Sequence, residues 1–237
     1  MIGRWLFLRG QRPSRNQAAG LAVLFVLALV SLFPLRLALE GRGLSARSVS
    51  GSVWSGRIED LRVGPLPIGD VRAGLRPLSL HTGEPELAAS REGFAARLSG
   101  SRGTIGVKRA QGSIVLREGL GGFPVSAIGF SDFRYALRGG KCAEAAGSLS
   151  VTLPPVSPLM PQDFVLEGKA RCDRGALYVP MTGPSGAEHL FLRIGGDGRW
   201  RADLTLTGLP PEVSAPLLEQ GWSGRPGGIG LSAAGRF

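Results

Sequence analysis

Residues 190–207 read LFLRIGGDGRWRADLTLT, and this stretch decides the fold class. Apolar and polar residues alternate on both sides of the glycine-rich segment 195–198, which is typical of strands with one buried face. Glycines supply the positive φ angles that a tight turn needs. The stretch therefore predicts an antiparallel hairpin. The apolar face of its second strand consists of Trp200, Ala202, Leu204 and Leu206.

The same alternation recurs along most of the chain. Further strands are expected in segments 94–98, 114–116, 133–137, 149–153, 164–172 and 229–237. The 37 glycines and 17 prolines suit many short strands joined by tight turns. A sheet with one apolar face must curl or be covered in water, so we predict a mainly β fold with a strongly curved antiparallel sheet, a half-pipe or meander. A two-sheet sandwich is the alternative.

An uncharged run lies near the N-terminus, at residues 16–35. A helix of that length rises about 30 Å, the thickness of a bilayer's hydrocarbon core. The preceding tail is basic, and no acidic residue occurs before Glu40. Its charges are those of Arg4, Arg9, Arg12 and Arg15. Such a flank resists translocation, so the N-terminus is expected in the cytoplasm and the remainder in the periplasm or at the cell exterior.

These observations predict three parts of the chain: a basic cytoplasmic tail at 1–15, a transmembrane helix at 16–39 and a periplasmic β domain at 40–237. The expected location is the inner membrane, with a single pass. A cleaved signal peptide is the alternative. The apolar region of a signal is usually about 7–15 residues long and ends in small residues, whereas this run is longer and ends in Phe33-Pro34-Leu35-Arg36.

The formal net charge of +10 has two interpretations. One is a surface for anionic lipid headgroups or acidic partners, and the other, which we prefer, is a biased composition on a solvated face. The basic residues are scattered and are not interleaved with aromatic residues. Binding of nucleic acid is therefore not expected.

The two cysteines, Cys142 and Cys172, fit neither a metal motif nor a CxxC redox motif. If segments 149–153 and 164–170 pair across the intervening loop, Leu153 lies opposite Phe164, and the two cysteines fall within a few positions of each other. Oxidation is permitted in the periplasm. We therefore expect a disulfide, the alternative being two buried thiols.

No catalytic, metal or cofactor site is predicted. His81 and His189 are far apart in sequence and lack a local carboxylate pattern. The G-x-S-x-G nucleophile motif and phosphate-binding glycine motifs are absent. The acidic pairs Glu59-Asp60 and Glu84/Glu86 are expected at solvated strand ends.

Residues 49–80 read VSGSVWSGRIEDLRVGPLPIGDVRAGLRPLSL, and here the chain resembles protein N of the type II secretion system (GspN). The closing segment 227–237 and the N-terminal span are also similar to that family. The positions singled out as a structural motif are Gly51, Val53, Trp54, Gly56, Leu75 and Pro77.

The resemblance implies a non-enzymatic inner-membrane component that contributes a periplasmic β domain to the export of folded proteins. Its implied partners are other type II secretion subunits and the inner membrane. The family is also similar to AsmA-like proteins, whose curved sheets are linked to lipid handling. A membrane-tethered lipid-binding or lipid-transfer module is therefore the alternative function, with lipid as a further partner.

Within the motif, Trp54 is expected to fill the concave core near the membrane end, because large aromatic residues are usually buried. Gly51 and Gly56 are expected to bracket a bend that a Cβ would strain. The alternative for Trp54 is an exposed hot spot for a partner protein.

Overall fold

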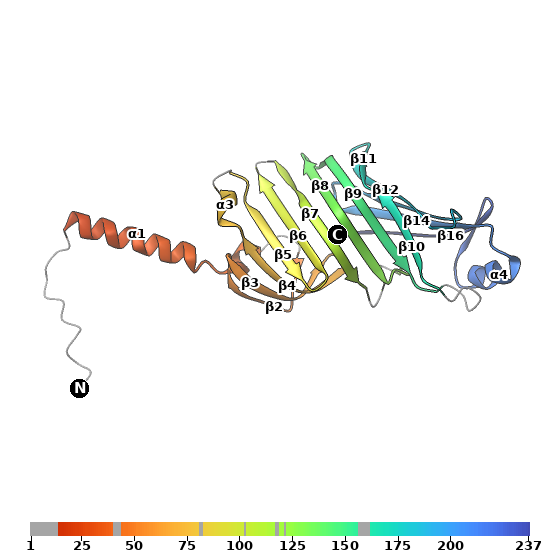
Figure 1. Cartoon of the computed structure of the whole chain (residues 1–237), viewed down its shortest axis with the longest axis horizontal. Coiled ribbons are helices and arrows are strands. Elements are labelled where there is room, and N and C mark those ends of the chain that lie inside the picture. Colours follow the sequence, from red (N-terminus) through yellow and green to blue (C-terminus); the bar gives the residue numbers. More distant parts are fainter. Residues whose placement is uncertain are drawn as a thin grey trace, which may run out of the picture.

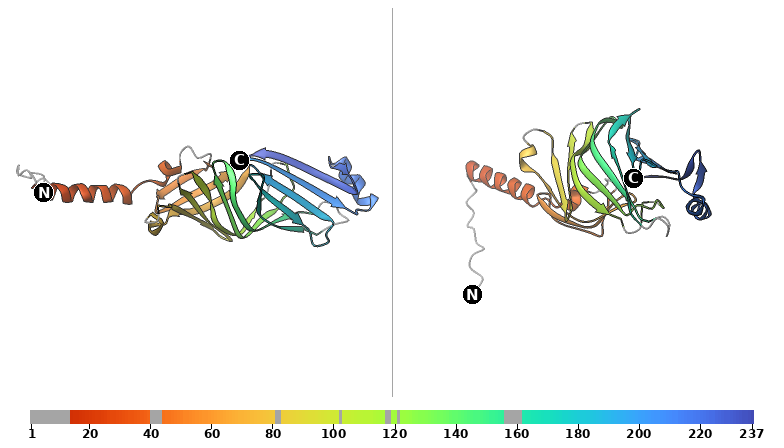
Figure 2. Two further views of the ribbon diagram at one scale, coloured as in Figure 1. Left: turned by 90° about the horizontal axis from the view of Figure 1, so that it is seen from above. Right: turned by 45° about the vertical axis from the view of Figure 1, so that its right-hand side comes forward.

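The structure is a computed structural model that describes residues 14–39, 44–80, 83–101, 103–116, 119–120, 122–155 and 162–237. One open antiparallel sheet forms most of it, and a helix projects from one end of the sheet (Figure 1). The sheet is strongly curved, as Figure 2 shows from two further directions. A mainly β fold with a curved antiparallel sheet is therefore confirmed. The alternative of a two-sheet sandwich is wrong, because all the described strands join one sheet.

The described residues form four helices and sixteen strands. The helices are α1 (Arg15–Ser31), α2 (Leu35–Leu39), α3 (Pro77–Leu80) and α4 (Pro211–Glu219). The first eight strands are β1 (Leu44–Ser45), β2 (Ser48–Ser52), β3 (Ser55–Val63), β4 (Leu66–Leu75), β5 (Glu86–Arg91), β6 (Phe94–Ser101), β7 (Thr104–Val115) and β8 (Ala127–Arg138). The others are β9 (Lys141–Leu153), β10 (Phe164–Lys169), β11 (Arg171–Asp173), β12 (Ala176–Thr182), β13 (Glu188–Ile194), β14 (Arg199–Thr207), β15 (Ser223–Arg225) and β16 (Gly228–Arg236).

Most strands pair with their neighbour in sequence. The order in the sheet is β1-β3-β4-β5-β6-β7-β8-β9-β10-β12-β13-β14-β16-β15, while β2 pairs with β3, and β11 with β12. Short turns make this possible. Gly139 and Gly140, for example, join β8 to β9 with φ angles of +57° and +72°, a conformation that favours glycine.

Both hairpins expected from sequence are present, and the one register that was predicted, Leu153 opposite Phe164, is confirmed. In β13 and β14, Ile194 lies opposite Trp200, and the four apolar residues of the second strand are each at most 6% exposed. In β9 and β10, Leu153 lies opposite Phe164. Alternation therefore identified both the strands and the buried face of β14.

The larger hydrophobic core lies on the inner face of the curved sheet, from β7 to β16. Leu166, Val179 and Leu204 are fully buried there. Helix α4 contributes Val213 and Leu217 to the same cluster. A second, smaller cluster lies at the end of the sheet nearest α1 and consists of Leu35, Ile58, Leu61, Val71 and Ala73.

The helix expected over residues 16–39 is divided in two. Helix α1 ends at Ser31, and Pro34 makes a bridge with Ser52 before α2 begins at Leu35. Proline cannot donate a backbone hydrogen bond and disfavours a helical residue before it, so one continuous helix does not form. Among the described helices, none combines the length and apolar character needed to span a bilayer.

Some expectations fall outside the described residues. The basic tail was expected at 1–15, of which residues 1–13 lie outside them, and so does His81.

Candidate functional site

The end of α1 is tied to the turn between β2 and β3. The indole Nε1 of Trp54 donates a hydrogen bond of 2.8 Å to the carbonyl oxygen of Val30. The backbone N–H of Val53 donates to the carbonyl oxygen of Phe33 at 2.9 Å, and that of Leu75 donates to the carbonyl oxygen of Val53 at 2.7 Å. We call residues 30–35, 51–56 and 73–77 together the helix–sheet junction.

The last carbonyl groups of a helix have no partner within the helix, and those that are not exposed to water need one from elsewhere. Trp54 supplies a donor at this position, and Pro34 continues the chain as a bridge to Ser52. The connection between helix and sheet is therefore made by backbone and side-chain hydrogen bonds rather than by a free linker.

Three glycines allow the close approach of the chain segments at the junction. A Cβ on Gly56 would lie 2.4 Å from Cδ2 of Leu35, and one on Gly74 would lie 2.3 Å from the backbone oxygen of Trp54. Gly51 has a φ of +86°, and a Cβ there would lie 2.5 Å from the backbone oxygen of Ser55. Side chains at these positions would force the segments apart.

Leu35 fixes the other side of the junction. It is 1% exposed and belongs to the smaller hydrophobic cluster with Ile58 and Val71. Sequence reasoning did not single out Leu35 or Val30. The available signal was Pro34, which interrupts the helix near the end of the apolar run. It separates the residues of α1 from Leu35, which packs against the sheet.

The structure brings the motif residues of segment 51–77 together at this junction. Val53 is buried, Leu75 is half-buried, and Pro77 is exposed at the start of α3. Trp54 is half-buried and belongs to neither hydrophobic cluster. Its position therefore differs from the concave core expected from sequence: a helix end 24 residues earlier in the chain provides its partner.

A groove of about 480 Å³ opens beside the junction. It is lined by Trp54 and by the basic side chains of Arg72 and Arg76. Leu78 also lines it and is 79% exposed, whereas large aliphatic side chains are usually buried. The groove thus combines an aromatic ring, an exposed aliphatic side chain and positive charge next to the end of α1.

A disulfide joins Cys142 of β9 to Cys172 of β11, with 5.6 Å between the Cα atoms. The backbone N–H of Cys142 donates to the carbonyl oxygen of Gly175, in the turn that follows β11. The bridge therefore connects β9 to a short strand that hydrogen-bonds to β12 rather than to β9 itself.

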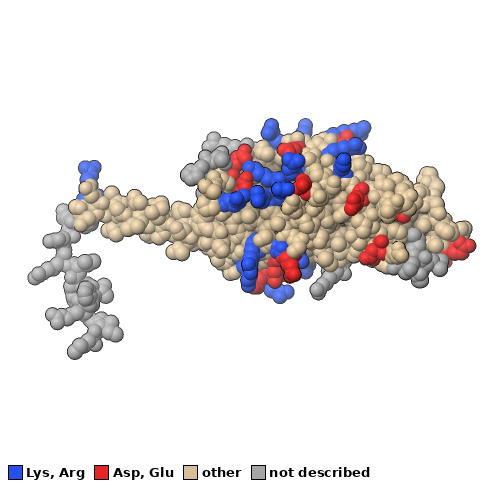
Figure 3. Space-filling view, in the orientation of Figure 1, with Lys and Arg blue, Asp and Glu red and all other residues tan. Residues whose placement is uncertain are grey.

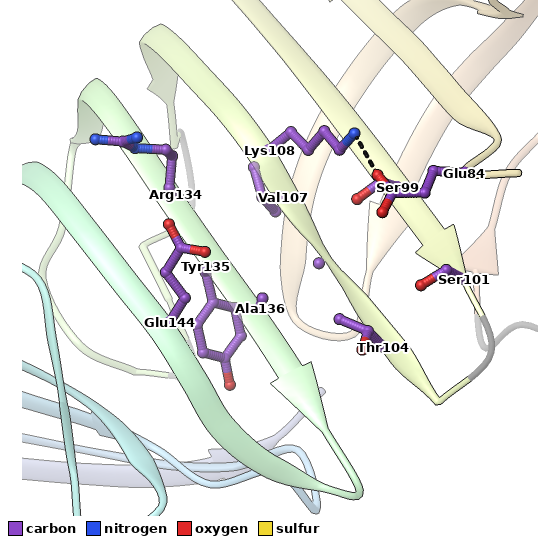
Figure 4. A pocket seen from close by; sticks show the side chains of 11 residues that line it. Glu84, Ser99, Ser101, Thr104, Val107, Lys108, Arg134, Tyr135, Ala136 and Glu144 are labelled. Carbon is purple, nitrogen blue, oxygen red and sulfur yellow. Dashed lines mark hydrogen bonds and ion pairs between the residues drawn. The ribbon is translucent and has the colours of Figure 1, made fainter. Parts of the chain in front are cut away.

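A second groove, of about 320 Å³, lies over β6 to β9 (Figure 4). At its edge, Nζ of Lys108 donates hydrogen bonds of 2.8 Å to both Glu84 and Glu86. The hydrogen bond from Lys108 lowers the pKa of Glu86, and the two carboxylates raise the pKa of Lys108. Burial raises the pKa of Tyr135. Arg76 also lies 3.7 Å from Glu86, so two cations face the two carboxylates, which favours a structural role for the cluster.

No group of three or more histidine, cysteine, aspartate or glutamate side chains suited to a metal ion occurs among the described residues. His189 stacks on Phe191 along the outer side of β13, with 6.5 Å between the ring centroids. This histidine therefore packs against an aromatic ring.

In a comparison with known families, the model of protein N of the type II secretion system (T2SS) matches residues 42–231. The match covers the sheet from before β1 into β16. No curated protein and no solved structure matches the chain.

Proposed function

The chain belongs to the type II secretion system protein N family, and from this premise we propose that it is a non-enzymatic inner-membrane component of the secretion apparatus. It contributes a periplasmic β domain to the export of folded proteins. The observation that carries the proposal is the family match over residues 42–231, which includes segments 51–56 and 73–77 of the helix–sheet junction and nearly all of the sheet.

The proposed membrane attachment is supported by the surface of α1. None of its described residues is buried, and Leu21, Leu24 and Phe25 are each more than 60% exposed. Figure 3 shows that charged side chains on the visible face gather over the sheet and at the start of α1, but not along the rest of the helix. A helix that is apolar all round needs an apolar environment.

We propose that the segment embedded in the membrane runs from the start of α1 to Phe33. Leu35 follows it but is buried against residues of β3 and β4, so its side chain is not available to lipid. Helix α1 has 17 residues and is about 25 Å long, so a locally thinner bilayer would accommodate the segment. The arginine-rich tail supports a proposed topology with residues 1–15 in the cytoplasm and the sheet in the periplasm.

Action through binding rather than catalysis is supported by the family, which is a secretion component. Its partners are accordingly other components of the apparatus. The alternative, a lipid-binding module, has weaker support. On the inner face, an entirely apolar cavity bordered by Phe123, Met181 and Trp200 measures about 50 Å³. At about 10–15 Å³ for each water, this is room for a few water molecules rather than for a lipid chain.

The test is deletion of the chain in its native cell, followed by measurement of the export of a folded substrate of the type II apparatus. Export should fall, and the full chain supplied in trans should restore it. Trypsin added to spheroplasts should digest the sheet but should not digest it in intact cells. Unchanged export after deletion would contradict the secretion role, and protection of the sheet in spheroplasts would contradict the topology.

A further inference from the structure

The two edges of the sheet differ in how much of the outermost long strand is paired. At the beginning of the sheet, β3 is covered along much of its length, because β2 pairs with residues 55–59 and β1 pairs with residues 62–63. At the other side, β15 covers only residues 228–230 of β16. From Leu231 to Arg236, β16 pairs with β14 on one side, and no described strand pairs with it on the other side. We call this stretch the β16 edge.

The register shows which backbone groups of the β16 edge are free. The N–H of Gly208 donates to the carbonyl oxygen of Gly227, and the N–H of Phe237 donates to that of Gly198. In an antiparallel ladder, the backbone N–H and C=O groups of successive residues point alternately toward one neighbouring strand and the other. Since Gly227 and Phe237 bond toward β14, the other odd-numbered residues of β16 do so too. Ser232, Ala234 and Arg236 therefore direct their N–H and C=O groups away from the sheet.

The usual protections of an exposed edge are weak here. Edge strands are commonly guarded by proline, lysine, a bulge or great shortness. The β16 edge has the sequence LSAAGR, with neither proline nor lysine, and it pairs with β14 without a register shift. Residues 232–235 have small side chains or none, so the regular β16 edge presents a template for another strand. Beyond it, the backbone of Phe237 lies against Gly64 of the β3–β4 turn, which limits the template to residues before Phe237.

The side chains around the β16 edge indicate which types of residue an added strand would need on each of its faces. On the inner side, Leu231 and Ala233 are half-buried and pack against the larger core. Residues of an added strand that share this face would extend the apolar core. An added strand with alternating apolar residues therefore fits this side.

The outer side is basic. Arg236 lies directly opposite Arg199 of β14, and like charges opposite one another destabilise a sheet. Arg199 has Asp197 at 3.5 Å, while no ion pair of Arg236 occurs among the described residues. Acidic residues on the outer side of an added strand would relieve this repulsion.

We propose that the β16 edge binds an extended segment of another secretion component as an additional strand, with apolar residues facing inward and acidic residues facing outward. This inference rests on the proposed function, since it takes the partner to be part of the apparatus. Its backbone hydrogen bonds would be made by Ser232, Ala234 and Arg236.

The first experiment is crosslinking in living cells that assemble the apparatus. A photoreactive p-benzoylphenylalanine replaces Phe237, next to the β16 edge, or Phe191, in the middle of the sheet. These two phenylalanines are 40% and 41% exposed, so they form a matched pair. Position 237 should crosslink to another secretion component, whereas position 191 should not. Crosslinks only between two copies of this chain, or equal crosslinking from both positions, would overturn the proposal.

Two variants test the mechanism in the same cells. Ala234→Pro removes an outward N–H without removing a bond to β14, so the sheet should form and its disulfide should remain intact. The crosslinked yield from position 237 should fall at least about tenfold, because the proline ring also obstructs the neighbouring strand. Arg236→Glu reverses the charge and should also lower the yield, whereas Arg138→Glu, an exposed arginine at the end of β8, should not.

The outcomes separate this inference from the proposed function. If deletion of the chain lowers export but folded Ala234→Pro and Arg236→Glu variants crosslink and export as the natural chain does, the edge proposal is wrong and the secretion role stands. If Ala234→Pro fails to fold, Arg236→Glu decides the question alone. If deletion leaves export unchanged, the proposed function itself is wrong.

Discussion

The indole nitrogen of Trp54 is hydrogen-bonded to the carbonyl oxygen of Val30, at 2.8 Å, so the turn between β2 and β3 holds the last turn of α1. The contact joins a residue of the expected motif to a helix that the motif does not include. This hydrogen bond and the neighbouring backbone hydrogen bonds fix the orientation of the helix relative to the sheet. The role of Trp54 is therefore to connect helix and sheet rather than to fill the core.

Replacement of Trp54 by phenylalanine should loosen the junction while the sheet stays folded. One hydrogen bond is lost, worth about 0.5–1.5 kcal/mol, which corresponds to about a twofold to tenfold increase in local opening. Trypsin cleavage after Arg36, measured on the full chain in mild detergent, should accelerate by this factor. Trp200→Phe is the matched control, since the buried Nε1 of Trp200 has no hydrogen-bond partner in the structure. Equal cleavage rates for both variants would contradict the role of the Trp54 bond.

Gly56→Ala should destabilise the chain by about 1–3 kcal/mol, because the added methyl group would overlap Leu35 and would lie 2.9 Å from the backbone oxygen of Ser50. The measurement is urea unfolding of the full chain in detergent, followed by circular dichroism. Gly100→Ala in β6 is the control, because a Cβ there meets nothing within 4 Å. Its stability should change by no more than about 0.5 kcal/mol. A Gly56 variant as stable as the control would show that the close approach is not required.

Removal of the Cys142–Cys172 disulfide should lower stability by about 3–4 kcal/mol. The estimate follows from the entropy of a closed loop with a sequence separation of 30 residues. Unfolding of the natural chain with and without reductant measures the effect. The double variant Cys142→Ser, Cys172→Ser should unfold with the same midpoint under both conditions. A reductant effect that persisted in the double variant would assign the effect to something other than the disulfide.

Stability should fall on acidification, in part through Glu86. Its pKa is lowered in the folded state by the hydrogen bond from Lys108. A carboxyl group of this kind stabilises the fold above its unfolded pKa, which is about 4.3, and the contribution is lost as the pH falls through the folded pKa. Lys108→Met removes the cause of the shift, so the variant should lose less stability than the natural chain between about pH 5 and pH 3.

The measurement is urea unfolding of both chains across that interval. The pKa of Lys108 is raised, so its own contribution is complete below its unfolded pKa and is lost only as the pH rises through its folded pKa. The titration of Lys108 itself therefore does not change the dependence of stability on pH below about pH 5. Parallel stability curves for the natural chain and Lys108→Met below about pH 5 would contradict the prediction.

Arg174→Asn should stabilise the chain by about 0.5–1 kcal/mol, because asparagine tolerates the left-handed conformation better than arginine does. Arg174 has a φ of +49° and precedes Gly175, with a φ of +77°, in the turn between β11 and β12. The midpoint of thermal unfolding should rise. Arg138→Asn changes the same residue types within a strand and should give no increase, so a similar rise in both variants would remove the conformational explanation.

Much of the sheet could be predicted because its information is local. Alternation with a period of two identifies the buried face of β14, and a glycine-rich turn identifies the hairpin that β13 forms with β14. The register of Leu153 with Phe164 follows from the same local logic. These features depend on residues that are close in sequence.

The junction could be predicted only in part, since its contacts are not local. Gly51 and Gly56 do lie where a Cβ would meet the backbone, as a glycine-flanked turn suggests. The partner of Trp54 is 24 residues away on a different kind of element, and no periodicity relates a helix end to a turn in a sheet. The packing of Leu35 against Gly56 is unpredictable for the same reason.

The sequential pairing of the strands has a consequence for how the chain reaches its final state. If the domain crosses the membrane with α1 leading, each strand that emerges finds its partner already present, since from β3 to β10 every new strand pairs with the one before it. Short-range pairing has a small entropic cost of loop closure and favours rapid acquisition of structure. We expect the domain to assemble progressively during translocation, so that chains arrested after β9 already resist protease up to β8; complete digestion of such chains would exclude this order.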